Sequence, residues 1–99
     1  MPELDKLIHE RARLLILTHL ASNEDSEISF NDIQNKLDFS SGNLSVQLKK
    51  LADANYLKIH KTYKDNKPYT TVMITSSGAT ALKAYLEEME QIIKSLKKS

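Results

Sequence analysis

The chain of 99 residues contains no cysteine, which excludes disulfide bonds, thiolate metal sites and cysteine nucleophiles. Its only glycines, Gly42 and Gly78, do not form a glycine-rich phosphate loop. No apolar run approaches the roughly 18 residues of a membrane span, and the acidic N-terminus does not resemble a signal peptide. We therefore expect a single domain, residues 1–99, located in the cytoplasm and requiring no cofactor.

The three histidines, His9, His19 and His60, lack the spacing of metal ligands and have no cysteine to complete a site. We expect the first two to be surface or interface residues and His60 to face solvent or a binding partner. No other group of side chains resembles an active site. The sequence therefore predicts a protein that binds no metal and is not an enzyme.

The net charge of +1 conceals an uneven distribution along the chain. Residues 1–39 carry four basic and eight acidic side chains, a net charge of −4. Residues 40–74 carry six lysines and two aspartates, a net charge of +4. A polyanion would be attracted to the second stretch. The alternative is that these lysines only keep that surface soluble, and composition does not decide between the two.

Residues 40–54 are predicted to form a helix with one apolar and one polar side. Ser40 is a good N-cap, and Leu44, Leu48 and Leu51 form one apolar stripe. Asn55 can adopt the left-handed conformation that ends a helix. The remaining side chains are small or polar, then basic, which suits a helix entering a major groove. The candidate DNA-binding residues here are Ser40, Ser41, Gly42, Asn43, Ser45, Val46, Gln47, Lys49 and Lys50. An ordinary amphipathic surface helix is the alternative.

Two further helices are predicted before this one. Residues 3–21 contain too many apolar side chains for one narrow stripe, so we expect this helix to be covered on two sides. Alternation at Ile28 and Phe30 indicates a short strand or an extended entry to a helix over residues 31–37. Together with residues 40–54, this short helix forms a helix-turn-helix pattern.

A β-hairpin is predicted directly after the DNA-reading helix. Leu57 and Ile59 alternate with polar residues, residues 64–68 have turn chemistry, and residues 69–74 form the return strand. We call residues 58–69 the wing. Its lysines could follow a phosphate backbone or approach a minor groove. The candidate DNA-binding residues of the wing are Lys58, Lys61, Lys64 and Lys67.

A long last helix is predicted over residues 76–97, with Thr75 as its N-cap. Its apolar residues recur every three or four positions, close to a heptad seam. Because an exposed seam favours aggregation, we expect a second copy of the chain to cover it. The predicted dimer interface comprises Leu4, Leu7, Ile8, Leu82, Tyr85, Leu86, Met89, Ile92, Ile93 and Leu96. The alternative is that the helix folds back onto its own domain.

Four stretches, residues 13–17, 28–33, 41–51 and 69–78, together resemble the winged helix-turn-helix domains of MarR-type and ArsR-type transcriptional regulators. The closest resemblance is to small stand-alone members of that group. It implies a mainly α fold with a small hairpin, in the order α-β-α-α-β-β-α. It also implies a homodimer that binds inverted-repeat duplex DNA and regulates transcription, here predicted as a repressor. No group of residues identifies a small-molecule effector.

Two departures from the family pattern affect the predicted contacts. Val46 stands where many relatives have arginine or another polar residue, so a polar contact is absent or replaced by apolar contact with a thymine methyl. Asn43 and Gln47 then become the candidates for base recognition. The wing lacks the usual arginine and glycine, which favours lysine contacts to the backbone with little sequence discrimination. The alternative function is a winged-helix module that docks an acidic protein partner.

Overall fold

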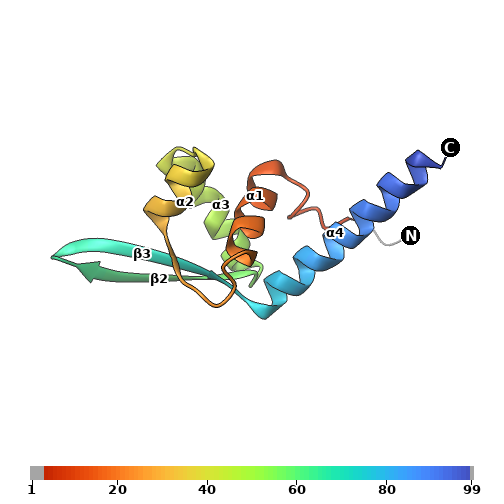
Figure 1. Cartoon of the computed structure of the whole chain (residues 1–99). Helices are drawn as coiled ribbons and strands as arrows, with labels where there is room; N and C mark the ends of the chain where they lie inside the picture. Colours follow the sequence, from red (N-terminus) through yellow and green to blue (C-terminus); the bar gives the residue numbers. More distant parts are fainter. Residues whose placement is uncertain (1–3, 99) are drawn as a thin grey trace.

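The computed structural model describes residues 4–98 and contains four helices and one small antiparallel sheet within that range (Figure 1). The elements are α1 (Arg11–Ala21), β1 (Ile28–Ser29), α2 (Phe30–Leu37), α3 (Ser41–Asp53), β2 (Leu57–Lys64), β3 (Lys67–Ile74) and α4 (Ser76–Lys97). Their order is that of a winged helix and confirms the predicted fold class. None of these helices is long and apolar enough to cross a membrane.

The first helix begins at Arg11, so the predicted start at residue 3 was wrong. Asp5 instead caps a separate turn, in which its Oδ1 accepts hydrogen bonds from the amides of Leu7 and Ile8. Glu10 then adopts an extended backbone and caps α1 by accepting from the amides of Ala12 and Arg13. Two acidic caps in succession therefore break a stretch whose apolar content suggested a continuous helix.

The helix-turn-helix is set by local backbone preferences. Ser29 caps α2, and Asp38 ends it in the left-handed conformation with φ of 56°. Ser40 caps α3 as predicted, because its Oγ accepts from the amide of Asn43 at 3.2 Å. After α3, Asn55 has φ of 65°, which confirms the predicted left-handed turn into the hairpin. Of the two forms predicted around Ile28 and Phe30, a short strand or an extended entry to the helix, the strand is present at Ile28 and Ser29, and Phe30 is already the first residue of α2.

The hairpin turns at Asp65 and Asn66, whose φ values of 53° and 63° are those of a tight two-residue turn. Strand β3 begins at Lys67, two residues before the predicted start, and includes Pro68. Strand β1 pairs only with Thr71 and Val72 of β3, so the outer half of the hairpin has two strands. Proline is tolerated there because no third strand needs its missing N–H.

The hydrophobic core joins α1, α3, the root of the hairpin and the first turns of α4. Its fully buried side chains include Ile8, Ile16, Leu17, Leu20, Ile33, Leu44, Leu51, Leu57 and Val72. Leu82 and Tyr85 of α4 are also buried. Beyond them α4 leaves the body (Figure 1), and the molecule measures 58 × 25 × 20 Å. The last helix therefore serves partly as core, as the alternative proposed, and partly as a projecting arm.

The first residues of α4 pack against Asn55 and Tyr56, which follow the end of α3. Thr75 caps the helix by accepting from the amide of Gly78, and its hydroxyl donates to the carbonyl of Asn55 at 2.7 Å. A Cβ atom on Gly78 would lie 2.0 Å from the carbonyl oxygen of Tyr56. Only glycine fits at this crossing, because the obstructing atom belongs to the backbone and cannot turn away.

We expect Gly78→Ala to lower the free energy of unfolding by about 3 kcal/mol, because the added methyl must displace the backbone. The matched control is Gly42→Ala, where a Cβ would meet nothing within 4 Å. The control should be neutral or stabilising by up to about 1 kcal/mol, since alanine favours helix over glycine. Urea unfolding of both variants measures this, and equal stabilities would contradict the assigned clash.

Candidate nucleic-acid interface

A furrow of about 720 Å³ runs between α3 and the hairpin. Its lining combines polar and charged side chains with apolar ones. The lining residues are Ser41, Ser45, Leu48, Lys49, Ala52 and Asp53 of α3, Phe30 of α2, and Ile59, Lys61 and Thr70 of the hairpin. The structure thus places part of the predicted helix surface and part of the wing side by side, with a lysine on each wall.

The outward side of α3 lies opposite the buried stripe of Leu44, Leu48 and Leu51. Gly42 occupies its first turn with open space above it, and Val46 follows one turn later with half of its surface exposed. The remaining outward residues are exposed too: Ser41, Asn43, Ser45, Lys49 and Lys50. A helix with such small side chains at its start can be approached closely by a base edge.

Gln47 is held by the protein itself. Its Oε1 accepts a hydrogen bond from Arg13 Nη1 of α1 at 2.7 Å, and its Nε2 donates to Asn43 Oδ1 at 3.1 Å. Arg13 also donates through Nε to the carbonyl of Leu7. The two side chains predicted to read bases are therefore linked to each other, and Gln47 is half-buried between α3 and α1. Base recognition by Gln47 stays a prediction, and it requires release from Arg13.

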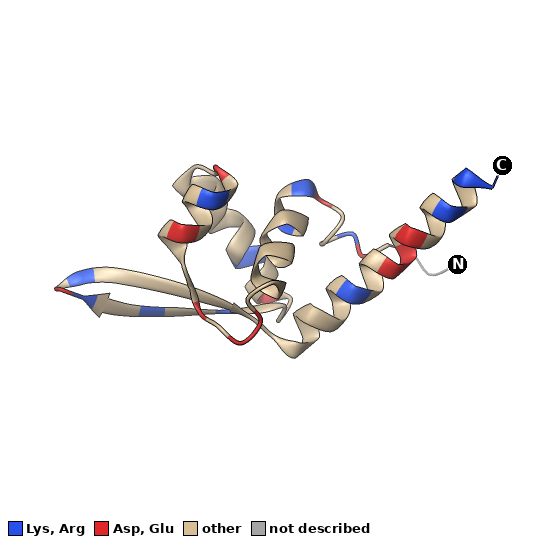
Figure 2. Ribbon diagram, viewed as in Figure 1, with Lys and Arg blue, Asp and Glu red and all other residues tan. Residues whose placement is uncertain are grey.

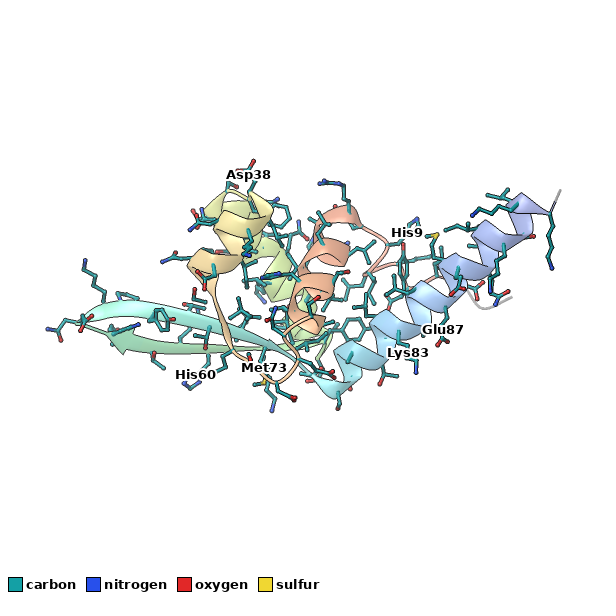
Figure 3. All side chains as sticks on the ribbon, in the orientation of Figure 1. His9, Asp38, His60, Met73, Lys83 and Glu87 are labelled. Atoms are coloured by element: carbon teal, nitrogen blue, oxygen red, sulfur yellow. The ribbon has the colours of Figure 1, made fainter. Side chains whose placement is uncertain are left out.

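The wing lysines divide between the two faces of the hairpin. Side chains alternate along a strand, so Lys61 shares the furrow with Ile59, whereas Lys58 lies with Met73 near the start of α4. Figure 3 shows His60 and Met73 on the side of the hairpin away from α2 and α3. The register places Lys58, and with it Lys64 and Lys67, on the face of the hairpin opposite to that of Lys61. Lys58 lies at the root of that face, whereas Lys64 and Lys67 lie at the tip of the hairpin, so contact of these lysines with DNA stays a prediction.

The tip of the wing concentrates positive charge (Figure 2). Lys64 and Lys67 pair across the strands beside the turn, and both are exposed. The Lys64 ammonium lies 5.1 Å from the centre of the Tyr69 ring, a cation–π contact. Asp65 is the acidic residue of the turn itself. The tip therefore presents two cations at the end of an extended arm.

One acidic residue faces the furrow. Asp53 accepts a hydrogen bond from Lys49 Nζ at 3.0 Å, in an ion pair whose two side chains are largely exposed. Such exposed pairs are weak and are screened by salt. Lys49 can therefore exchange this partner for a phosphate at little cost.

A second polar contact joins the N-terminal turn to the chain just after α3. The Tyr56 hydroxyl donates a hydrogen bond to Asp5 Oδ2, which ties the N-terminal turn to the residue where the chain leaves α3. This hydrogen bond raises the pKa of Tyr56 from 10.0 to about 12, with burial and the negative charge of Asp5 adding to the effect. The N-terminal turn thus contacts the chain after α3 through Asp5 and is joined through the carbonyl of Leu7 to Arg13 of α1, which contacts α3 at Gln47.

The histidines lie apart, as the sequence indicated. His9 Nδ1 is hydrogen-bonded to the Tyr85 hydroxyl at 2.9 Å, beside α4 (Figure 3). Within residues 4–98, no group of three histidine or carboxylate side chains could hold a metal ion. The surface of α3 and the hairpin described above is the candidate site.

Comparison with known protein families now decides the class. Residues 12–93 match the model of the winged helix DNA-binding domain, which covers most of the chain. The chain belongs to this family. The prediction of a DNA-binding winged helix-turn-helix domain is thereby confirmed.

Related proteins agree with this assignment. An uncharacterised protein of Methanocaldococcus jannaschii is 32% identical over 91 residues, which is 92% of this chain and 97% of that protein. The solved structure of a transcriptional regulator homologue from Pyrococcus horikoshii is 29% identical, with a TM-score of 0.83, and covers 91% of this chain and 87% of that one. These matches and the family model support the predicted class, a DNA-binding transcriptional regulator.

A more distant likeness concerns the fold alone. The Staphylococcus aureus regulator MepR in its DNA complex is 22% identical, with a TM-score of 0.61, over 83% of this chain and 70% of that one. MepR is a MarR-family-like protein, so the predicted resemblance of this winged helix to that group is confirmed at the level of fold.

Several residues of this winged-helix site were not foreseen. Arg13 stood out only as part of the family resemblance, and no pattern in the sequence marks it as the partner of Gln47. Asp53 and Thr70 also line the furrow, and no spacing or composition pattern predicts them there. The Asp5–Tyr56 contact joins residues 51 positions apart, which no local pattern reveals.

We expect Asp5→Asn to lower the pKa of Tyr56 from about 12 toward 10, because the anionic acceptor is lost. The ultraviolet absorbance of tyrosinate, recorded against pH, measures this pKa. The Tyr56→Phe variant shows which titration step belongs to Tyr56, because that step disappears from its curve. Since folding raises this pKa, the contact stabilises the fold fully below pH 10 and progressively less between pH 10 and 12. An unchanged titration in Asp5→Asn would rule out the assigned cause.

Proposed function

We propose that this winged-helix protein is a homodimeric transcriptional repressor that binds inverted-repeat duplex DNA. Helix α3 enters the major groove, and the wing lies along the phosphate backbone. The observation that carries the proposal is the furrow shared by α3 and the hairpin, with Lys49 on one wall and Lys61 on the other. The solved complex of MepR with DNA supports the same use of the fold.

The electrostatics favour nucleic acid as the ligand. The stretch that contains α3 and the wing holds the net charge of +4, whereas residues 1–39 are acidic. Lysines on the helix and on the hairpin tip can neutralise several phosphates at once, which makes the affinity depend on salt. Such binding requires no catalytic group, so the protein acts without enzymatic chemistry, in the cytoplasm where duplex DNA would be available to it.

A second copy of the chain is proposed to cover the arm of α4. Leu86 and Ile93 lie two turns apart with 46% and 45% of their surfaces exposed, and Met89 and Ile92 between them are half-buried. Leu4 and Leu7 are half-buried and pack against the core, as Met89 does, and they remain candidates for the interface. Ile8, Leu82 and Tyr85 are corrected to core residues, because their side chains are already buried within one chain.

A hollow of about 450 Å³ beside α4 supports this arrangement. Ala21 at the end of α1 and Glu24 in the loop after it line the hollow, together with Ala79, Thr80, Leu82, Lys83, Leu86, Glu87 and Glu90 of α4. The apolar side chains of a partner helix would fill it. A dimer built through α4 would present two α3 helices to successive major grooves, roughly 34 Å apart.

We expect the double substitution Leu86→Glu and Ile93→Glu to convert the dimer into a monomer, because four glutamates would face one another across the two-fold axis. The fold should persist, since both side chains are substantially exposed. Size-exclusion chromatography with light scattering measures the mass. Gln91→Glu, exposed on the other side of α4, is the matched control and should remain dimeric. A monomeric native protein would refute the proposed interface.

We expect Lys64→Ala to weaken binding to all duplex sequences equally, because the wing tip contacts phosphate. The slope of log affinity against log salt should decrease by about 1 for each lost contact. Lys97→Ala, an equal loss of charge at the far end of α4, should leave both quantities unchanged. Fluorescence anisotropy over a series of salt concentrations provides the measurement. A loss confined to one DNA sequence would contradict backbone contact.

The class of ligand can be tested with random duplex DNA at low and at moderate salt. Binding at low salt that weakens as salt rises supports the proposal. No binding at low salt would favour the other predicted function, the docking of an acidic protein partner on the lysine surface. The same assay on the Lys64→Ala protein shows whether the wing contributes.

A further inference from the structure

Val46 is an exposed apolar residue in the middle of a polar and basic helix surface. Half of its surface is open to solvent, whereas the other large apolar residues of α3 are buried. Ser45, Lys49 and Lys50 flank it, and all three are exposed. The neighbouring lysines attract a polyanion to this surface. An apolar side chain among them therefore lies where the bound polyanion would contact the protein.

We propose that Val46 contacts the C5 methyl group of a thymine in the major groove and thereby selects the base at that position. This inference rests on the proposed function. The thymine methyl is the apolar group that base edges display in the major groove. Contact between Val46 and this methyl group removes apolar surface of both partners from water, which stabilises the complex. A polar base edge has no such apolar surface to bury.

The geometry of α3 leaves room for this contact. Side chains of a helix lean toward its N-terminus, so Val46 leans over the preceding turn, which contains Gly42. Gly42 has no side chain, and the space above it is open. The methyl groups of Val46 are therefore uncovered on the side that a base edge would approach. Valine is also nearly fixed in one rotamer within a helix, so little freedom is lost on contact.

The neighbouring polar groups are less free to act. Gln47 is bonded through both ends of its amide, to Arg13 and to Asn43. Its use in base recognition would require these two hydrogen bonds to break. Contact by Val46 requires no rearrangement, so this residue sets the preference in the conformation that the structure shows.

The test begins with selection of duplexes from a random pool by the wild-type protein. In the selected duplex, each thymine is then replaced singly by deoxyuridine, which preserves pairing and removes only the methyl group. We expect one replacement in each half-site to weaken wild-type binding about fourfold, the effect of one buried methyl group. Val46→Ala should bind the thymine and deoxyuridine duplexes within a factor of about 1.5 of each other, since the contact is absent.

Lys97→Ala is the control, because it changes an exposed side chain at the far end of α4 and should preserve the fourfold difference. The proposal is overturned if the wild type binds every deoxyuridine duplex as tightly as the parent. It is also overturned if Val46→Ala keeps the difference. In both cases specific binding to the selected duplex would still uphold the proposed function. Failure to select or bind any duplex would overturn the two together.

Discussion

The backbone at Asn55 and Tyr56 crosses the start of α4. This contact fixes the positions of α3, the wing and α4 relative to one another. Thr75 donates from its amide to the carbonyl of Tyr56 at 3.1 Å and from its hydroxyl to Asn55, while the Tyr56 amide donates to Leu51. Helix α3, both strands of the wing and the long last helix all meet here. Because Gly78 lets the backbones touch, the angle between the DNA-reading helix and the arm is fixed by main-chain atoms.

Much of the fold was predictable because its boundaries are set locally. Ser40 and Thr75 bond to amides three residues away, and Asp65 and Asn66 adopt the backbone that a tight hairpin needs whatever surrounds them. The start of α1 was not predictable in the same way. Asp5 is fixed there partly by Tyr56, and this distant contact helps hold a separate turn in a stretch that local preference extends as a helix.

In the candidate site, too, some features follow from local patterns in the sequence and others depend on distant contacts. The exposed, small and basic side chains of α3 could be assigned from their spacing relative to the leucine stripe. The state of Gln47 could not, because its partner Arg13 lies 34 positions earlier in the chain. The faces of the wing depend on strand register, which separates Lys58 from Lys61 although they are only three positions apart. Apolar spacing in α4 likewise did not distinguish the buried Tyr85 from the exposed Leu86.

The short reach of β1 has a consequence for how this protein behaves in a crowded solution. Beyond Thr71, both edges of the outer hairpin offer backbone donors and acceptors without a neighbouring strand, a template on which another unfolded or folded chain could add. Lys61, Lys64 and Lys67 line these edges and repel a second hairpin of the same sequence, and Pro68 removes one donor. The hairpin therefore stays two-stranded and does not pair with further chains into an extended sheet.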